Sequence, residues 1–234
     1  MTVHGNSGRP DKSDRTLMAA GMVGLIGALL VGIGEFTLQF SAAGGYDAAD
    51  YRYFADVSAQ RLSIGHFLSV LAAPLYLIGY WHLGQAFSRG GSPRSGQFIF
   101  LVGSYAFVVG IAWLGGRIYL ALLAQQLAGA DAALAPLLSD LLARFAAHNE
   151  PLVNVLRIAM LAISLLWIWR VAAGATLYPR WMALFSPIAL LASIFAAYFF
   201  APAWLGAWLL PAAMNLAHAL LFALSLLALR QARQ

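Results

Sequence analysis

Apolar residues occupy most of this chain in six long runs that are separated by short polar segments. Each run is close to or above the roughly 20 residues that an α-helix needs to cross a hydrocarbon core about 30 Å thick. The runs are Leu17–Phe40, Leu62–Phe87, Phe98–Leu123, Pro151–Val171, Trp181–Phe200 and Leu209–Leu229. Because an open strand edge in lipid leaves its backbone groups unpaired, the pattern predicts six transmembrane helices.

The segment between the third and fourth runs, residues 130–148, has a different pattern. Its large apolar residues recur at helical spacing: Leu134, Leu137, Leu138, Leu141, Leu142 and Phe145. This spacing predicts a short amphipathic helix lying at the outer membrane interface. The predicted fold class is therefore all-α, a polytopic membrane protein with a six-helix bundle and an interfacial helix between the third and fourth spans.

Composition places the chain in the membrane class. Of its 234 residues, 62% are hydrophobic and 10% are charged, and the mean hydropathy is +0.76. These values leave too little polar surface to cover a soluble globule. The net charge of +5 lies in short loops between apolar runs, so we expect no nucleic-acid partner. The absence of cysteine excludes disulfides, thiolate chemistry and cysteine metal sites.

The basic residues alternate between loops and predict an orientation. They dominate the N-terminus, the second and fourth loops and the C-terminus: Arg9, Lys12, Arg15, Arg89, Arg94, Arg170, Arg180, Arg230 and Arg233. The first and third loops mix arginine with aspartate, and the fifth is uncharged. By the positive-inside rule, both termini are cytoplasmic in a multi-pass protein of the inner (plasma) membrane.

This organisation predicts three parts of the chain. Residues 1–16 form a disordered cytoplasmic N-terminus, residues 17–229 a single six-helix transmembrane domain, and residues 230–234 a cytoplasmic tail. The run Leu17–Phe40 is longer than a signal-peptide core, so we expect it to remain uncleaved.

Ionisable and amide side chains interrupt the apolar runs at one depth. Counted at about 1.5 Å per helical residue, nine of them fall in the outer half of the predicted bundle. Those within or at the mouth of the spans are Glu35, His66, Arg117, His148, Glu150, Asn154, Arg157, Asn215 and His218. Because charges are costly in hydrocarbon and usually functional there, the pattern predicts a hydrated pocket that opens outward.

The residue types suggest separate roles in this pocket. Glu35, His66 and His218 are candidates for acid/base catalysis. Arg117, Arg157, Asn154, Asn215, Glu150 and His148 are candidates for ligand binding. Because a guanidinium fork suits a carboxylate or phosphate, the expected ligand is an anionic, lipid-like amphiphile such as a membrane lipid. Whether the protein catalyses a reaction stays open at this point.

A metal site is the weaker interpretation of the same residues. Histidine and carboxylate are suitable zinc ligands. No two of these histidines lie four residues apart on one helix, and two arginines nearby would repel a dication. We therefore expect no metal and no cofactor.

Two other function classes remain as alternatives. The polar side chains would serve a non-catalytic scaffold if they only hold the helices together. A small-solute transporter would be consistent with six spans in a 3+3 repeat, although the second half shows no echo of the first. The kinked spans expected at Pro74 and Pro187 suit any of these classes.

Two further features have interfacial interpretations. His82, near the cytoplasmic end of the second span, is expected at the membrane interface. The first loop carries Tyr46, Tyr51, Tyr53 and Phe54, which are expected to form an aromatic belt, with a lid over the pocket as the alternative.

Several short motifs resemble those of a known family. The fourth loop contains Tyr178-Pro179-Arg180-Trp181, and the sixth run contains Asn215-Leu216-Ala217 with Phe222. Gly34-Glu35 and the stretch from Pro74 to Gly79 are similar as well. The chain resembles a family of six-helix prokaryotic membrane proteins catalogued only as a domain of unknown function. The resemblance implies the fold and no reaction.

Overall fold

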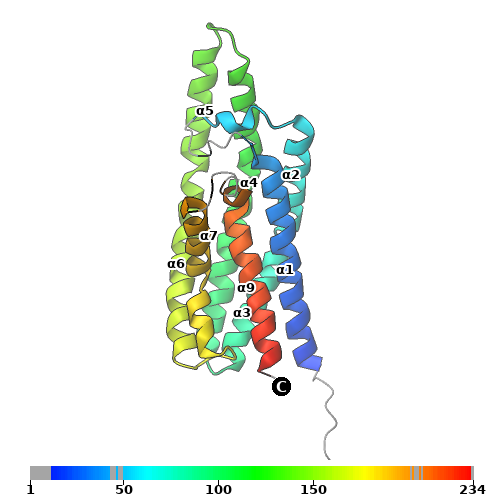
Figure 1. The fold of residues 1–234 in the computed structure, drawn as a ribbon, viewed down its shortest axis with the longest axis vertical. Helices are drawn as coiled ribbons and strands as arrows, with labels where there is room; N and C mark the ends of the chain where they lie inside the picture. The colour runs from blue at the N-terminus through cyan, green and yellow to red at the C-terminus, as the bar shows by residue number, and fades with distance from the viewer. Residues whose placement is uncertain are drawn as a thin grey trace, which may run out of the picture.

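The structure is a computed structural model that describes residues 12–42, 46, 50–200, 202, 206 and 208–232. These residues form helices that run side by side along one long axis (Figure 1). The helices are α1 (Lys12–Gln39), α2 (Ala59–Ala72), α3 (Leu75–Arg89), α4 (Pro93–Ala128), α5 (Ala135–Asn149), α6 (Pro151–Ala172), α7 (Pro187–Phe200) and α9 (Ala213–Gln231). Short 3-10 turns are η1 (Arg52–Phe54), η2 (Arg180–Phe185) and η3 (Leu210–Ala212). The predicted all-α class is confirmed.

Five helical segments are long and apolar enough to cross a membrane. They are Lys12–Gln39, Ala59–Arg89, Pro93–Ala128, Ala135–Ala172 and Leu210–Gln231. The predicted span Trp181–Phe200 instead yields the 14-residue helix α7. Its first part is the 3-10 turn η2, which leaves α7 to begin at Pro187. The residues that the structure describes therefore include five long apolar helices and one shorter one where six spans were expected.

The two chain ends differ from the expected boundaries. Helix α1 begins at Lys12, five residues before the predicted start at Leu17, and α9 continues to Gln231. Residues 1–11 of the expected N-terminal segment lie outside the described residues, as do residues 233–234 of the expected tail.

Prolines mark the boundaries between two pairs of consecutive helices, α2 with α3 and α5 with α6. The break between α2 and α3 falls at Ala73 and Pro74, as expected for a kinked second span. Between α5 and α6, Glu150 keeps helical angles (φ −62°, ψ −34°) before Pro151. Proline lacks an N–H but fits a first helical turn, so the chain continues in the same direction. Helix α5 accordingly extends α6 along the bundle axis (Figure 1). The sequence predicts a helix lying across this axis at the membrane interface, and that arrangement is not observed.

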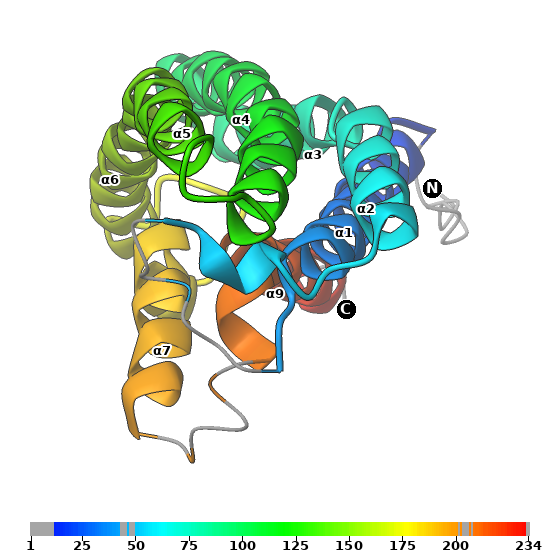
Figure 2. The same ribbon diagram turned by 90° about the horizontal axis from the view of Figure 1, so that it is seen from above.

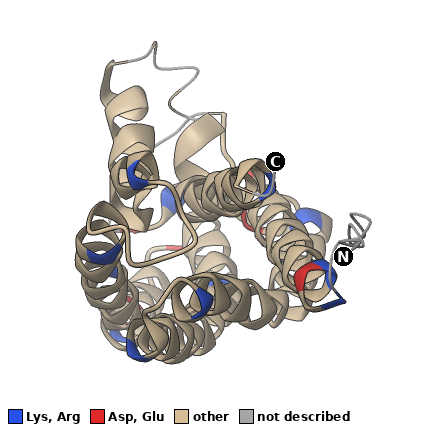
Figure 3. Cartoon of the chain, turned by 90° about the horizontal axis from the view of Figure 1, so that it is seen from below, with Lys and Arg blue, Asp and Glu red and all other residues tan. Residues whose placement is uncertain are grey.

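The helices enclose a central space when the molecule is viewed from above. Figure 2 shows α1, α2, α3, α4, α6, α7 and α9 around this space, with η1 crossing its upper end. Helices α1 and α9 pack on each other, as do α4 and α6, while α3 contacts both α1 and α4. Figure 3, seen from below, shows Lys and Arg at several helix ends on that side.

Helices α1 and α3 touch backbone to backbone. A Cβ atom placed on Gly24 would lie 2.5 Å from the Cα of Gly79, and one on Gly79 would lie 2.5 Å from the Phe222 ring of α9. Contacts this short leave room only for hydrogen, so the two glycines set the distance between these helices.

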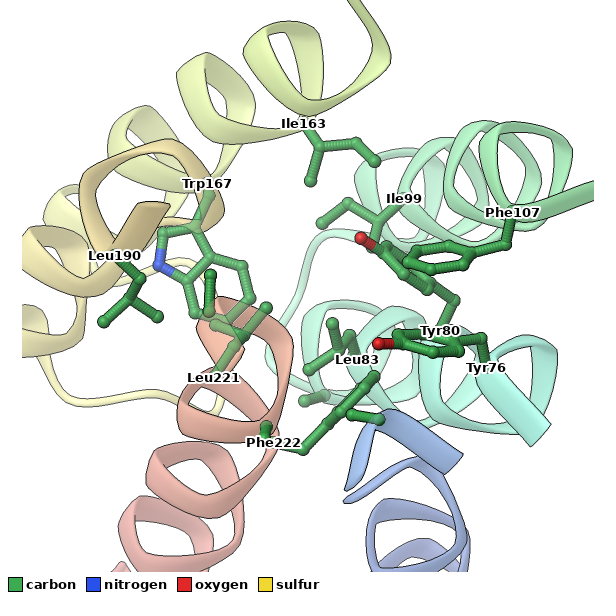
Figure 4. Packing of buried hydrophobic residues seen from close by; sticks show 14 of the residues in the cluster. Tyr76, Tyr80, Leu83, Ile99, Phe107, Ile163, Trp167, Leu190, Leu221 and Phe222 are labelled. Carbon is green, nitrogen blue, oxygen red and sulfur yellow. The ribbon is translucent and has the colours of Figure 1, made fainter. Parts of the chain in front are cut away.

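The lower half of the bundle is filled by aromatic side chains (Figure 4). The rings of Tyr76 and Phe107 stack with centroids 3.8 Å apart, and Phe222 packs against Tyr76 from α9. Trp167 is fully buried, and its indole N–H donates to the carbonyl of Met182 at 2.8 Å. This packing closes the central space from below.

His82 is buried, so the interfacial position expected from the sequence is wrong. Its Nδ1–H donates to the carbonyl of Leu17 at 2.7 Å, and its Nε2 accepts from the Ser225 hydroxyl at 2.7 Å. The Tyr178 hydroxyl in turn donates to Ser225 at 2.7 Å. These bonds satisfy the imidazole inside the protein, which removes its need for interfacial water.

Replacing Gly79 should destabilise the bundle. Gly79→Val introduces a side chain where the nearest atoms already lie at 2.5 Å, and we expect a loss of about 1–3 kcal/mol of unfolding free energy. The matched control is Gly115→Ala in α4, where an added Cβ meets nothing within 4 Å. Thermal unfolding in detergent should show a lower midpoint for Gly79→Val alone. Equal midpoints for the two variants would contradict this role of Gly79.

Candidate functional site

A cavity of about 610 Å³ lies in the upper half of the bundle. Helices α1, α4, α6, α7 and α9 contribute to its wall, and the loop that carries η1 covers its upper end (Figure 2). Its polar lining gathers toward η1 and includes Glu35, Gln39, Tyr51, Arg117, Glu150 and Asn215. Its remaining wall is largely aliphatic and aromatic, for example Val31, Phe107, Leu114, Leu156, Leu191 and Phe195.

Arg117 of α4 is the centre of the polar lining and is only 6% exposed. Its Nη1 donates to Oε1 of Glu150 at 2.6 Å, which makes an ion pair. Its Nη2 donates to Oε1 of Gln39 at 2.9 Å and to the hydroxyl of Tyr53. One guanidinium therefore joins α4, the α5–α6 junction, α1 and η1.

Aromatic rings surround the Arg117 guanidinium on its remaining sides. Its Cζ lies 5.3 Å from the ring centroid of Tyr51, 5.6 Å from that of Phe54 and 5.1 Å from that of Trp113. Rings at these distances attract a cation through their negative faces, and they also exclude water. The charge is thus stabilised in a site with little solvent.

The loop between α1 and α2 covers the upper end of this arrangement. Tyr53 and Phe54 are buried, at 3% and 0% exposure, so the belt expected from the sequence is wrong and the lid alternative describes the loop better. Gln125 of α4 donates to the carbonyls of Phe54 and Val57 and fixes the loop from above.

Tyr51 connects the same loop to Glu150. Its hydroxyl donates to Oε1 of Glu150 at 3.0 Å. Burial and the neighbouring Glu150 carboxylate raise the pKa of Tyr51 to about 12, so the hydroxyl remains protonated and able to donate. Tyr51 also has left-handed backbone angles (φ 53°, ψ 30°), which cost a non-glycine residue about 1–3 kcal/mol and which the surrounding contacts must offset.

Glu35 of α1 belongs to the same network but does not contact Arg117 directly. Its Oε1 accepts from Nε2 of Gln39 at 2.9 Å, and its Oε2 accepts from Nδ2 of Asn215 at 2.5 Å. Oδ1 of Asn215 accepts from the Tyr76 hydroxyl at 2.5 Å. A continuous series of hydrogen bonds therefore runs from Tyr76 of α3 through α9 and α1 to Arg117 and Glu150.

The structure brings together five of the nine site residues expected from the sequence. Glu35, Arg117, Glu150, Arg157 and Asn215 all line the cavity. Arg157 is exposed and donates to Oδ1 of Asn154 at 3.1 Å. The ion pair is Arg117 with Glu150, whereas the sequence suggested Glu35 with Arg117 or Glu150 with Arg157.

The four other expected site residues lie outside the cavity lining. His218 donates from Nδ1 to the Met214 carbonyl at 2.8 Å, and its Nε2 accepts from the Tyr80 hydroxyl at 2.9 Å, inside the aromatic core. His66 is half-buried on α2 beside Phe67. Asn154 and His148 are exposed on α6 and α5. The three histidines are therefore dispersed over the bundle.

This dispersion also bears on metal binding. Within residues 12–42, 50–200 and 208–232, no group of three or more histidine, aspartate or glutamate side chains is placed to hold a metal ion. The polar end of the cavity offers hydrogen-bond donors and one carboxylate–guanidinium pair.

Sequence reasoning missed several residues that complete the network. Gln39 lies four residues after Glu35 and so on the same helix face, a signal that was available. Tyr76 and Trp113 are indistinguishable by sequence from other aromatic residues in the spans. Tyr51 and Tyr53 were noticed only as aromatic loop residues, and their contacts with Glu150 and Arg117 depend on tertiary folding.

Comparisons with known proteins give one match. A family model described as "Family of unknown function (DUF6796)" matches residues 10–232. No curated protein and no solved structure matches the chain. This match confirms the expected resemblance to a family without an assigned function.

Removing the Arg117 guanidinium should destabilise the protein more than removing an exposed one. Arg117→Gln removes the cationic partner of Glu150 and the donor to Gln39, and we expect a loss of about 2–4 kcal/mol, at the lower end because Glu150 is partly solvated. The control, Arg144→Gln, breaks the exposed pair with Asp140 and should change stability little. Unfolding titrations in detergent measure both, and equal effects would contradict the central role of Arg117.

Proposed function

The chain belongs to this family of unknown function, from which no activity follows, and we propose that it is a membrane protein that binds an anionic, lipid-like amphiphile in the upper cavity. The observation that carries the proposal is the division of the cavity into a polar end and an apolar wall. The polar end contains Arg117 and Glu150, and the apolar wall includes Phe107, Leu114 and Leu191. A molecule with a polar head and a hydrocarbon chain matches both parts.

The size of the cavity supports a small amphiphile. A volume of about 610 Å³ falls within the 300–1,000 Å³ typical of sites that enclose small ligands. The apolar wall suits one hydrocarbon chain, whose burial contributes about 0.8 kcal/mol for each methylene. A chain that enters from the bilayer is already surrounded by hydrocarbon, so its transfer into the cavity gains less free energy than transfer from water. The polar contacts must therefore supply most of the selectivity.

Two arginines offer hydrogen bonds to an anionic head. The Nε–H of Arg117 is buried and has no acceptor among the described residues. Arg157 has no carboxylate partner in the described part of the chain, and it also lines the cavity. Guanidinium groups with free donors suit phosphate and carboxylate.

Binding is favoured over acid/base catalysis by the position of the histidines. Of the three catalytic candidates, only Glu35 lines the cavity, and its carboxylate already accepts bonds from Gln39 and Asn215. A general acid or base must reach the reacting atom directly or through one water. His66 and His218 have no such position on the cavity wall.

A scaffold is the second candidate function. The hydrogen bonds from Tyr76 to Glu150 join four helices and the α5–α6 junction, which is what interhelical polar residues do in purely structural bundles. Transport is supported by no comparable observation, because aromatic side chains fill the bundle below the cavity.

The charge distribution supports a cytoplasmic location for both chain termini in the plasma membrane. Figure 3 shows Lys and Arg at the lower helix ends. By their positions in the elements that begin or end there, these residues are Lys12, Arg15, Arg89, Arg94, Arg170, Arg180 and Arg230. Asp14 is the acidic residue described there. This excess of positive charge is typical of the cytoplasmic side, and the polar end of the cavity would then lie toward the outside. We place α7 as a sixth membrane segment that reaches only part of the way across.

Filling the cavity should abolish amphiphile binding. Val153→Trp places a large ring on the α6 wall of the cavity, whereas Ile158→Trp places the same ring on an exposed part of α6 outside the lining. We expect the affinity for a fluorescent lysophospholipid to fall at least tenfold in Val153→Trp only, since the ring occupies the space of the chain. The measurement is a fluorescence titration in detergent micelles, with the lysophospholipid kept below the concentration that saturates the micelles.

Three outcomes of this titration have distinct meanings. Loss of binding in Val153→Trp alone supports the proposed function. No binding by the wild-type protein to any single-chain phosphate or carboxylate amphiphile favours the scaffold. Equal binding by both variants places the ligand elsewhere and overturns the proposed site.

Cysteine labelling tests the orientation, because the chain contains no cysteine of its own. Ala132 lies between α4 and α5 at the upper end, and Ala173 follows α6 at the lower end, and both are exposed. In intact cells, a membrane-impermeant maleimide should react with Ala132→Cys and should reach Ala173→Cys only after permeabilisation. The opposite pattern would reverse the assigned orientation.

A further inference from the structure

The exposed residues of the cavity wall indicate a side opening between α6 and α7. Of the cavity-lining residues that the structure describes, only Arg157 and Phe195 are exposed, and all the others are buried or half-buried. Arg157 lies on α6, and Phe195, whose side chain is 38% exposed, lies on α7. Exposed side chains on a cavity wall mark where the cavity meets the exterior, so the opening faces sideways between these two helices.

The lower parts of the same two helices are closed against each other. The hydroxyl of Ser164 on α6 accepts from the backbone N–H of Ile188 on α7 at 3.0 Å. Below this bond, Trp167 of α6 donates to Met182 of η2. The gap between α6 and α7 is therefore confined to the level of Arg157, Val153 and Phe195.

The height of the opening places it beside lipid. Arg157 lies 15 residues before the lower end of α6 at Ala172, which corresponds to about 22 Å at 1.5 Å per residue. A hydrocarbon core is about 30 Å thick, so the opening meets its upper third. An arginine at this depth extends its guanidinium toward the headgroups while its stem stays in hydrocarbon.

We infer that the gap between α6 and α7 is a lateral portal through which one acyl chain of an outer-leaflet phospholipid enters the cavity, while Arg157 binds its phosphate. This inference rests on the proposed function and specifies its ligand and entry route. The apolar rim at Phe195 and Val153 admits the chain from the bilayer without passage through water. The phosphate is held at the rim by Arg157, which has no carboxylate partner among the described residues, and the head faces the polar end at Arg117 while the chain follows the apolar wall.

The polar end of the cavity favours this route over entry from above. The loop with Tyr51 and Tyr53 is held over the upper end by hydrogen bonds to Glu150 and Arg117. Opening that end would break an ion-paired network, whereas separating α6 from α7 above Ser164 breaks no hydrogen bond that the structure shows between them. The lateral path therefore requires the smaller rearrangement.

Crosslinking the portal tests the route. In the double variant Val153→Cys/Phe195→Cys, a short bifunctional thiol reagent bridges α6 and α7 across the opening. A matched pair, Gln85→Cys/Gln97→Cys, bridges α3 and α4 outside the cavity, where both side chains line a separate small pocket between these helices. The probe is fluorescent phosphatidylglycerol exchanging from phosphatidylcholine vesicles into protein reconstituted in phosphatidylcholine nanodiscs.

Crosslinking at α6–α7 should slow exchange of the bound probe by roughly tenfold or more, since a closed gate limits both entry and release. The reference is the uncrosslinked form of the same variant, so the exchange rates before and after crosslinking are compared within one protein. The α3–α4 crosslink should have no effect. Equal exchange rates before and after crosslinking at α6–α7 would overturn the portal even if the probe binds.

Arg157 variants test the phosphate contact. Arg157→Gln should weaken phosphatidylglycerol binding roughly tenfold, while Arg157→Lys should restore part of the affinity because it keeps the charge. Inorganic phosphate in excess should not displace the lipid, since the chain supplies part of the binding. Displacement by phosphate alone would identify a free-anion site. Absence of binding in the wild type would contradict the proposed function itself, and unchanged binding in Arg157→Gln would contradict this inference only.

Discussion

The ion pair between Arg117 and Glu150 is the interaction on which the upper half of this structure depends. A guanidinium that is 6% exposed within an apolar bundle must keep a carboxylate partner and neutral acceptors. Glu150 sits where α5 continues into α6, so the pair joins that junction to α4. Gln39 and Tyr53 accept from the same guanidinium and bring α1 and the η1 loop to the same point. The position of the lid thus follows from the need to satisfy one buried charge.

The lower half obeys a different constraint. Gly24 and Gly79 let α1 and α3 meet at backbone distance, and Phe222 and Trp167 fill the space that remains. Dense aromatic packing below and a polar network above leave a cavity at their boundary. Its amphipathic character is a consequence of this division, because each half contributes its own kind of side chain to the wall.

The short helix α7 accounts for the proposed side opening of the cavity. Ser164 and Ile188 hold α7 against α6 near its lower end, and above this level the two helices contribute Arg157 and Phe195 to an exposed rim. A full-length span in this position would contact α6 over its whole height and would enclose the cavity. The loss of one predicted span is therefore linked to the proposed route for lipid.

The sequence by itself determined the all-α class, the apolar segments and the shared level of Glu35, Arg117 and Asn215 in the bundle, because these follow from helical rise and from the cost of charge in hydrocarbon. It did not determine which way each side chain faces or how two helices join. Because Glu150 has helical backbone angles, α5 and α6 share the direction of the bundle axis. From the sequence alone, a proline does not indicate whether the helix continues or changes direction. His218 and His82 face the interior core, while Arg157 reaches the rim, because helix rotation is set by packing between helices distant in sequence. Only the tertiary structure decided those contacts, since each depends on several helices meeting at once.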